Sequence, residues 1–203
     1  MSSSLNLDLS QKQNVLIQHI TMKTSAFTTF TLAIGLVAGV MIPEDAPDGL
    51  FEASLDKRDE AYGNFTLLAR HVPGEMVPTA PTKRSVRFDR RYTPLPISRE
   101  DCSDGDYVDP SDFSMSKGEL IRRCDSGTQI GKKSVLAYKV GSSTAYACSY
   151  GGQNPCGKDE IDAAFLEIDK SCGSQTKTGW VLMDNWAKSY GREILTNEIC
   201  GSL

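Results

Sequence analysis

The sequence predicts an α+β domain in which an antiparallel β-sheet carries two helices on one face. Two segments with helical spacing alternate with two pairs of segments that are rich in aromatic and β-branched residues. All six cysteines lie in the second half of the 203-residue chain, and both histidines precede them. The folded domain is therefore expected at 92–203, closed by three disulfides. Its cysteines are Cys102, Cys124, Cys148, Cys156, Cys172 and Cys200.

The first helix is expected to begin at Ser116, because Ser116 and Glu119 have the spacing of a capping box. Leu120 would then face the interior. Two strands follow, at Ser134–Val140 and at 144–150, on either side of a glycine-serine turn. Their aromatic and β-branched residues favour this assignment.

The second helix is the most regular pattern in the chain. Its apolar residues recur at helical spacing: Ile161, Ala164, Phe165, Ile168 and Cys172. Acidic residues at its start favour the helix dipole, and Gly173 ends it. The segments 179–183 and 186–194 are expected to form a final hairpin across Asp184 and Asn185.

Residues 1–39 have the features of a secretory signal region. A charge-free apolar run at 26–42 follows Met22 and Lys23, and small residues near Gly39 suit a cleavage site. The polar residues before Met22 do not fit this pattern, so translation is expected to start at Met22. A buried core helix or a membrane anchor is the alternative, and Pro43 with the acidic residues after it disfavours an anchor.

Residues 40–91 are expected to be a disordered pro-segment. They are rich in proline and charge, contain no cysteine, and show no sustained helical or alternating period. Three dibasic pairs offer processing sites: Lys57-Arg58, Lys83-Arg84 and Arg90-Arg91. The segment 55–61 (LDKRDEA) resembles the leader junction of the yeast mating pheromone, which implies cleavage by a kexin-type protease. The mature protein is then expected to begin after Arg84 or Arg91.

The cysteine pairing is open, because six cysteines allow 15 arrangements. A short loop suggests Cys148 with Cys156, and closure of the domain ends suggests Cys102 with Cys200. No zinc site or other metal site is expected, since 92–203 has no CxxC pair and no histidine. An acidic run at 101–112 lacks the twelfth-position glutamate of a calcium-binding EF-hand, so it is expected to be an exposed loop.

The absence of histidine from 92–203 excludes serine or cysteine nucleophiles that depend on a histidine base. Chemistry with a pair of carboxylates remains possible. A net charge of −4 disfavours nucleic-acid binding. Trp186, Tyr190 and Arg192 lie close together near Trp180, and such a mixture is typical of binding hot spots. These residues form either an exposed binding face or the core of the final hairpin.

Four segments of the domain carry a family resemblance: 146–152 (YACSYGG), Cys172-Gly173, 179–181 (GWV) and 186–192 (WAKSYGR). With the leader and the six cysteines, they resemble the small secreted cysteine-rich effectors of filamentous fungi, some of which adopt the killer-toxin α/β sandwich. The resemblance implies a virulence or toxin-like protein that binds an extracellular or host protein, a glycan or a membrane, and it implies no cofactor or catalytic residue. A secreted carboxylate-dependent hydrolase and the precursor of a 59–84 peptide remain alternatives.

Overall fold

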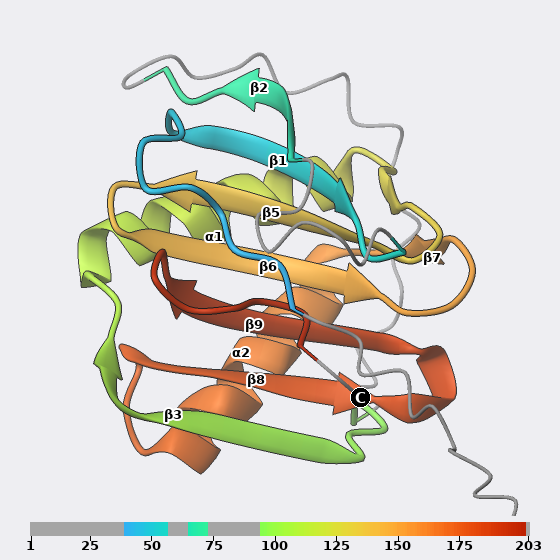
Figure 1. Cartoon of the computed structure of the whole chain (residues 1–203). Coiled ribbons are helices and arrows are strands. Elements are labelled where there is room, and N and C mark those ends of the chain that lie inside the picture. Colours follow the sequence, from blue (N-terminus) through green and yellow to red (C-terminus); the bar gives the residue numbers. More distant parts are fainter. Residues whose placement is uncertain (1–38, 57–64, 73–93, 202–203) are drawn as a thin grey trace, which may run out of the picture. The chain divides into compact units, whose positions relative to one another are not determined.

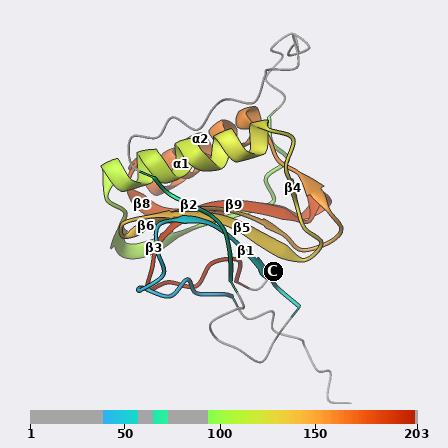
Figure 2. The ribbon, with the colours of Figure 1, turned by 90° about the horizontal axis from the view of Figure 1, so that it is seen from above.

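The structure is a computed structural model that describes residues 39–56, 65–72 and 94–201. Its main element is a seven-stranded antiparallel sheet with the strand order β2-β1-β5-β6-β9-β8-β3 (Figure 1). Within these residues there are two α-helices, α1 (Pro110–Asp125) and α2 (Lys158–Cys172), and both lie on the same side of the sheet (Figure 2). The expected antiparallel sheet and two helices are confirmed, and the sheet is larger than expected.

The strands of the large sheet are five to nine residues long. Their bounds are β1 Gly49–Ser54, β2 Thr66–Arg70, β3 Arg99–Tyr107, β5 Ser134–Val140, β6 Ser143–Ser149, β8 Lys177–Met183 and β9 Lys188–Ile194. A small second sheet joins β4 (Gln129–Ile130) to β7 (Asn154–Pro155). The two expected hairpins are present as β5-β6 and β8-β9. Trp186 lies in a 3-10 turn, η1 (Asp184–Trp186), and not in the last strand.

Helix α1 begins six residues before the expected capping box. The Asp109 carboxylate accepts hydrogen bonds from the backbone N–H groups of Ser111 and Asp112, both at 2.9 Å, and Pro110 occupies the first turn. Ser116 is buried inside the helix, where its hydroxyl donates to the Phe113 carbonyl oxygen at 3.0 Å. The capping-box prediction was therefore wrong, because an aspartate followed by a proline is a complete helix start of its own.

Part of the expected disordered pro-segment belongs to the sheet. Strand β1 lies between β2 and β5, and its residues Leu50, Phe51 and Ala53 are buried. The expectation of disorder over 40–91 is thus wrong for 40–56 and for the residues of β2. A six-residue strand is too short to show a sustained period, and β1 forms because every residue of β5 is buried and needs a partner on that side. The signal region up to residue 38 and the three dibasic pairs lie outside the described residues.

Three disulfides close the fold, as expected, but neither suggested pairing is correct. The bonds are Cys102–Cys172, Cys124–Cys156 and Cys148–Cys200. Cys148 cannot reach Cys156 because β6 directs it to the side of the sheet without helices, whereas Cys156 packs in the core beneath the helices. The first bond joins α2 to β3, the second joins α1 to the segment just before α2, and the third fastens the C-terminal segment to β6.

The acidic run at 101–112 is not a loop. Its first part lies in β3, and Asp109 and Asp112 belong to the start of α1. Strand β3 pairs with β8 along one edge of the sheet and has an irregular register between Cys102 and Tyr107. Charged side chains and a bulge at a sheet edge discourage pairing with another chain. The acidic residues of β3 therefore protect this edge.

Each face of the sheet has its own core. The core beneath the helices includes Leu120, Leu136, Ile161, Phe165, Ile168 and Val181. The core on the opposite, helix-free face includes Val40, Ile42, Val135, Ala137, Tyr146 and Ile199. The helix-free core is covered by the segments 39–46 and 195–201, where the backbone N–H groups of Val40 and Ile199 each donate to the other residue's carbonyl oxygen at 2.9 Å. None of the helices in the described part of the chain is long and apolar enough to cross a membrane.

Candidate binding site on the helix-free face

Arg192, one of the three expected binding residues, lies in the interior. It is 0 % exposed, and its guanidinium forms an ion pair with Asp169 of α2 at 2.6 Å. The same group donates to the backbone carbonyl oxygens of Lys177 and Ser174, both at 2.7 Å. Arg192 therefore joins β9 to β8 and to α2, and its assignment to an exposed binding face was wrong.

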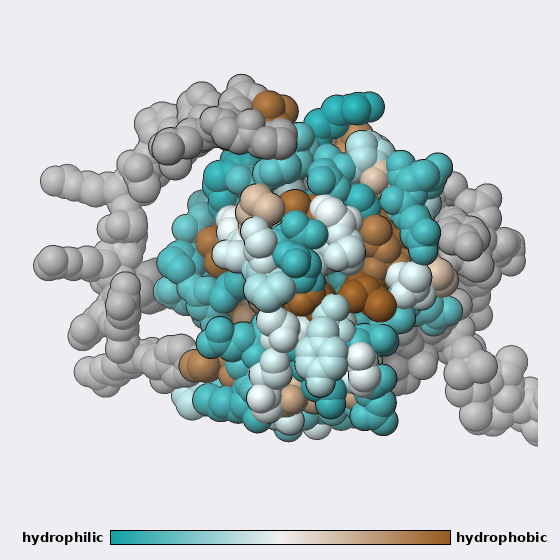
Figure 3. Space-filling view, turned by 90° about the vertical axis from the view of Figure 1, so that its left-hand side faces the viewer, coloured by the Kyte–Doolittle hydropathy of each residue, from teal (hydrophilic) through white to brown (hydrophobic). Residues whose placement is uncertain are grey.

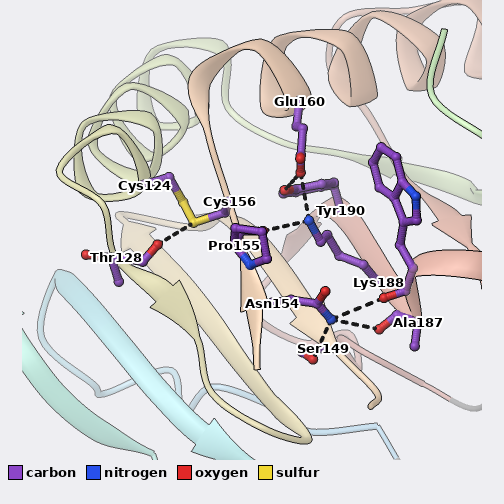
Figure 4. A network of polar contacts seen from close by, with 11 residues as sticks. Cys124, Thr128, Ser149, Asn154, Pro155, Cys156, Glu160, Ala187, Lys188 and Tyr190 are labelled. Carbon is purple, nitrogen blue, oxygen red and sulfur yellow. Dashed lines mark hydrogen bonds and ion pairs between the residues drawn. A yellow bond between two sulfur atoms is a disulfide. The ribbon is translucent and has the colours of Figure 1, made fainter. Parts of the chain in front are cut away.

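Tyr190 is also buried, in a polar network between β9 and the first turn of α2 (Figure 4). Its hydroxyl donates to the Glu160 carboxylate at 2.7 Å. The Lys188 ammonium donates to the same carboxylate at 2.8 Å and to the Pro155 carbonyl oxygen at 2.6 Å. Burial and the neighbouring Glu160 charge raise the pKa of Tyr190 well above its usual value, so the phenol stays a donor. This network holds α2 against the sheet.

Trp186 is the exposed member of the predicted trio, at 39 % of its surface. Its ring centroid lies 5.3 Å from the Lys188 ammonium, and its carbonyl oxygen accepts a hydrogen bond from Asn154 at 3.2 Å. Since Tyr190 and Arg192 are buried, the three residues form no continuous surface. Of the two alternatives expected from the sequence, an exposed binding face or the core of the final hairpin, the second is correct for Tyr190 and Arg192.

The helix-free face carries a cleft that the sequence did not reveal. We call it the aromatic cleft. It has a volume of about 240 Å³, and its lining residues are Tyr146, Tyr150, Trp180, Leu182, Ser189, Glu198, Cys200 and Gly201. They come from β6, β8, β9 and the C-terminal segment. The disulfide Cys148–Cys200 holds this last wall in place.

Strand register explains how the cleft forms. Trp180 on β8 lies opposite Gly191 on β9, and Gly191 lies opposite Tyr146 on β6, so the three share one row on the helix-free face. A methyl group at Gly191 would come within 2.2 Å of the Tyr146 hydroxyl oxygen. The missing side chain allows the Tyr146 ring to lie across β9 towards Trp180. The small residue Ser189 in the next row leaves space beside it.

The aromatic residues of the cleft stay neutral. Burial raises the pKa of Tyr146 well above its usual value. Burial also raises the pKa of Tyr150, although its hydrogen bond to the Ser189 hydroxyl, at 3.0 Å, and the charge of Arg99 act in the opposite direction. The cleft thus offers uncharged aromatic walls with one hydroxyl pair between them.

Acidic groups lie at the edge of the aromatic cleft. Glu198 lines it and is exposed, and Asp101 on β3 lies opposite Trp180 in the sheet register. Arg99 lies on the same face of β3, opposite Leu182, and its guanidinium is 3.4 Å from the Asp184 carboxylate. Figure 3 shows the other end of the sheet, at the β5-β6 turn, where the surface is mainly hydrophilic with smaller apolar areas between.

A buried carboxylate anchors the C-terminal segment beside the aromatic cleft. Glu193 on β9 accepts hydrogen bonds from the Asn197 amide at 2.9 Å and from the Ser103 hydroxyl at 3.2 Å. The same amide nitrogen donates to the Asp106 carboxylate at 2.9 Å. Burial raises the pKa of Glu193 to about 6, and Asp106 adds to this effect. The buried hydroxyl of Thr144, opposite Glu193 on β6, has no hydrogen-bond partner within the described residues.

The part of the chain that the structure describes contains no group of three or more histidine, cysteine or acidic side chains placed to hold a metal ion. No family model matches the chain, and neither a curated protein nor a solved structure matches it. The aromatic cleft is therefore the feature on which a function can be argued. In the sequence, the trace of the cleft is Gly191, a residue without a side chain within a strand. Its importance becomes visible only when the strand register places it opposite Trp180.

Proposed function

We propose that this chain is a secreted, disulfide-stabilised binding protein of the effector or toxin-like kind, which recognises an extracellular or host target through the aromatic cleft. One observation carries the proposal. Two partly exposed rings, Tyr150 and Trp180, stand in a cleft on the face of the sheet that no helix covers. Aromatic residues in such positions dominate the affinity of many interfaces.

The construction of the aromatic cleft supports a binding role. Strands of the large sheet form its floor, and the C-terminal segment forms one wall. This wall is held by the disulfide Cys148–Cys200 and by the backbone hydrogen bonds between Val40 and Ile199. A wall that is already ordered costs little conformational entropy when a ligand binds. Three disulfides suit an oxidising compartment, and this supports the proposal of secretion.

The proposed mature form keeps β1. Removal of everything before Arg84 or Arg91 takes away β1 and β2 and uncovers one edge of β5. We therefore revise the expected maturation: cleavage at a dibasic pair leaves 39–56 in the sheet, held by β5 through strand pairing. Release of a 59–84 peptide, one of the alternatives, removes β2 and is less well supported.

A hydrolase is the second candidate. The observation in its favour is Glu193, whose pKa is raised to about 6 and which is joined to Asp106 through Asn197. However, Glu193 is 3 % exposed and is not among the residues that line the aromatic cleft. A polysaccharide cannot reach a carboxylate in this position, so binding remains the better-supported function. Turnover of any polysaccharide in a panel, lost in Glu193→Gln, would reverse this order.

The two tryptophans provide the test, because one lines the aromatic cleft and the other is exposed elsewhere. The secreted full chain, Trp180→Ala and Trp186→Ala are labelled and applied to intact plant and fungal cells, and the retained protein is measured. We expect Trp180→Ala to lose binding at least about tenfold, as hot-spot residues do, and Trp186→Ala to retain it. Circular dichroism and thermal melting establish that both variants are folded. A second cleft variant, Glu198→Trp, fills the exposed rim without removing a core residue. Normal binding by this variant and by Trp180→Ala would exclude the aromatic cleft.

A further inference from the structure

We infer that the aromatic cleft takes a cationic side chain, the guanidinium of an arginine or the ammonium of a lysine, from a target protein. This inference rests on the proposed binding function and names the chemistry of the target. It follows from the size of the cleft, its aromatic walls and the sign of the charges around it.

The size of the aromatic cleft limits what enters it. At about 240 Å³ it is smaller than the ~300–1,000 Å³ of most small-molecule sites. It therefore admits one extended side chain and not a drug-sized ligand or several sugar rings. The rest of the target would lie across the surface outside.

The walls of the aromatic cleft favour a cation. Trp180 and Tyr150 are both partly exposed there, and the faces of such rings attract ammonium and guanidinium groups. The chain already contains this type of contact in its interior, where the Arg192 guanidinium lies 5.1 Å from the Phe113 ring centroid. The hydroxyl oxygens of Tyr150 and Ser189 provide hydrogen-bond acceptors between the rings.

The charges at the rim have the complementary sign. Glu198 lines the aromatic cleft, Asp101 lies beside Trp180, and none of the lining residues is basic. Arg99 is basic and near enough to act on Tyr150, but it does not line the aromatic cleft and it forms an ion pair with Asp184. The net charge of −4 for the whole chain acts in the same direction at longer range. A neutral sugar would gain from the rings and from hydroxyl hydrogen bonds to these carboxylates, but it carries no positive charge for them to attract.

The test uses the tryptophan of the aromatic cleft as a reporter. Trp180 and Trp186 are the two tryptophans of the chain, so Trp186→Phe leaves Trp180 as the single one. The secreted Trp186→Phe protein is titrated with N-acetyl-arginine amide, with the neutral analogue N-acetyl-citrulline amide, and with chitin and glucan oligosaccharides. We expect a saturable change in fluorescence with the arginine amide and binding about tenfold weaker, or none, with the citrulline amide.

Charge variants test the role of the rim. Adding Glu198→Gln to the reporter protein should weaken binding of the arginine amide about threefold, which is the scale of an exposed ion pair, and added salt should weaken it further. The matched control is Glu44→Gln, which removes an exposed glutamate that does not line the aromatic cleft and should leave binding unchanged.

Each outcome decides the inference. Equal binding of the two amides, or a Glu198→Gln variant as good as its control, would overturn it. Binding of oligosaccharides in place of the arginine amide would also overturn it, while leaving the aromatic cleft as a glycan site and the proposed function intact. If no probe binds, the inference fails, and the comparison of Trp180→Ala with Trp186→Ala on cells decides the proposed function separately.

Discussion

On one face of the sheet two helices cover a continuous core, whereas on the other face two terminal segments leave a cleft open. The helices are fastened by the disulfides Cys102–Cys172 and Cys124–Cys156, and the terminal segments by Cys148–Cys200 and a single backbone bridge. Strand β9 contributes to both faces. Its residues Tyr190 and Arg192 bind α2, while Ser189 and Gly191 shape the aromatic cleft. The comparison shows that adjacent residues of one strand can have different roles, some stabilising the fold and others shaping the proposed binding site.

The largest expected effect on stability comes from removing β1 together with the segment 39–46, which covers the helix-free core. A chain of 92–203, the domain expected from the sequence, should not reach the native state, whereas 39–203 should. The apolar side chains lost from the core are Val40, Ile42, Leu50, Phe51 and Leu55. At ~1.5–3 kcal/mol each, their burial is comparable to the ~5–15 kcal/mol that stabilises a typical domain.

Near-ultraviolet circular dichroism and the yield of secreted protein would measure this effect. Adding a 39–56 peptide to the shorter chain should restore part of the native signal, because β1 pairs with β5 without a covalent bond. A shorter chain that melts cooperatively at the temperature of the longer one would show that the helix-free face does not depend on its cover.

Arg192→Ala should have the next largest effect, because it leaves the Asp169 carboxylate without its partner on the closed face. Breaking a buried ion pair from one side costs ~3–5 kcal/mol. Arg99→Ala is the matched change on the open face, where both partners of the ion pair are about half exposed, and should cost less than ~1 kcal/mol. Urea unfolding of both variants would measure the difference. Similar costs for the two would contradict the contrast between the faces.

Glu193 should make stability depend on pH. Its pKa is about 6 in the folded state against an ordinary value of 4.5, so between these two values the folded chain binds more protons than the unfolded chain. The free energy of unfolding should therefore fall as pH rises from 4.5 through 6, by about 2 kcal/mol at most.

Glu193→Gln should remove this part of the pH profile and raise stability at pH 7 relative to the natural chain. Urea unfolding across the pH range, with Glu44→Gln as the exposed control, would measure it. If Glu193→Gln kept the full slope of the natural chain, the titration would have to belong to another group.

Trp186→Ala should have the smallest effect. The residue is 39 % exposed, and its contact with the Lys188 ammonium is worth only ~0.5–1 kcal/mol at a surface position. A thermal melt should move by no more than a few degrees. A loss as large as that of Arg192→Ala would mean that the 3-10 turn supports the buried network of Lys188.

Local patterns predicted the parts of the fold that depend on local chemistry. Strand β5 has the expected bounds, and α2 begins and ends within one residue of its pattern, since helical spacing, acidic first-turn residues and a terminal glycine all act within a few residues. The same kind of argument missed α1's true start, because Asp109 and Pro110 outweigh the capping box at Ser116. It also missed β1, because its six residues become buried only when they pair with β5, about 85 positions further along the chain.

The sequence by itself determined that this protein has an antiparallel sheet with two helices and three disulfides, because cysteine number and side-chain periodicity are properties of the chain alone. Only the tertiary structure decided which cysteines pair and which face each residue of β9 occupies. Register has a period of two, so a shift by one residue would exchange Arg192 with Gly191 between the closed face and the open one. The aromatic cleft depends on that register across three strands and on a C-terminal segment placed by Cys148–Cys200, so no local pattern contains it.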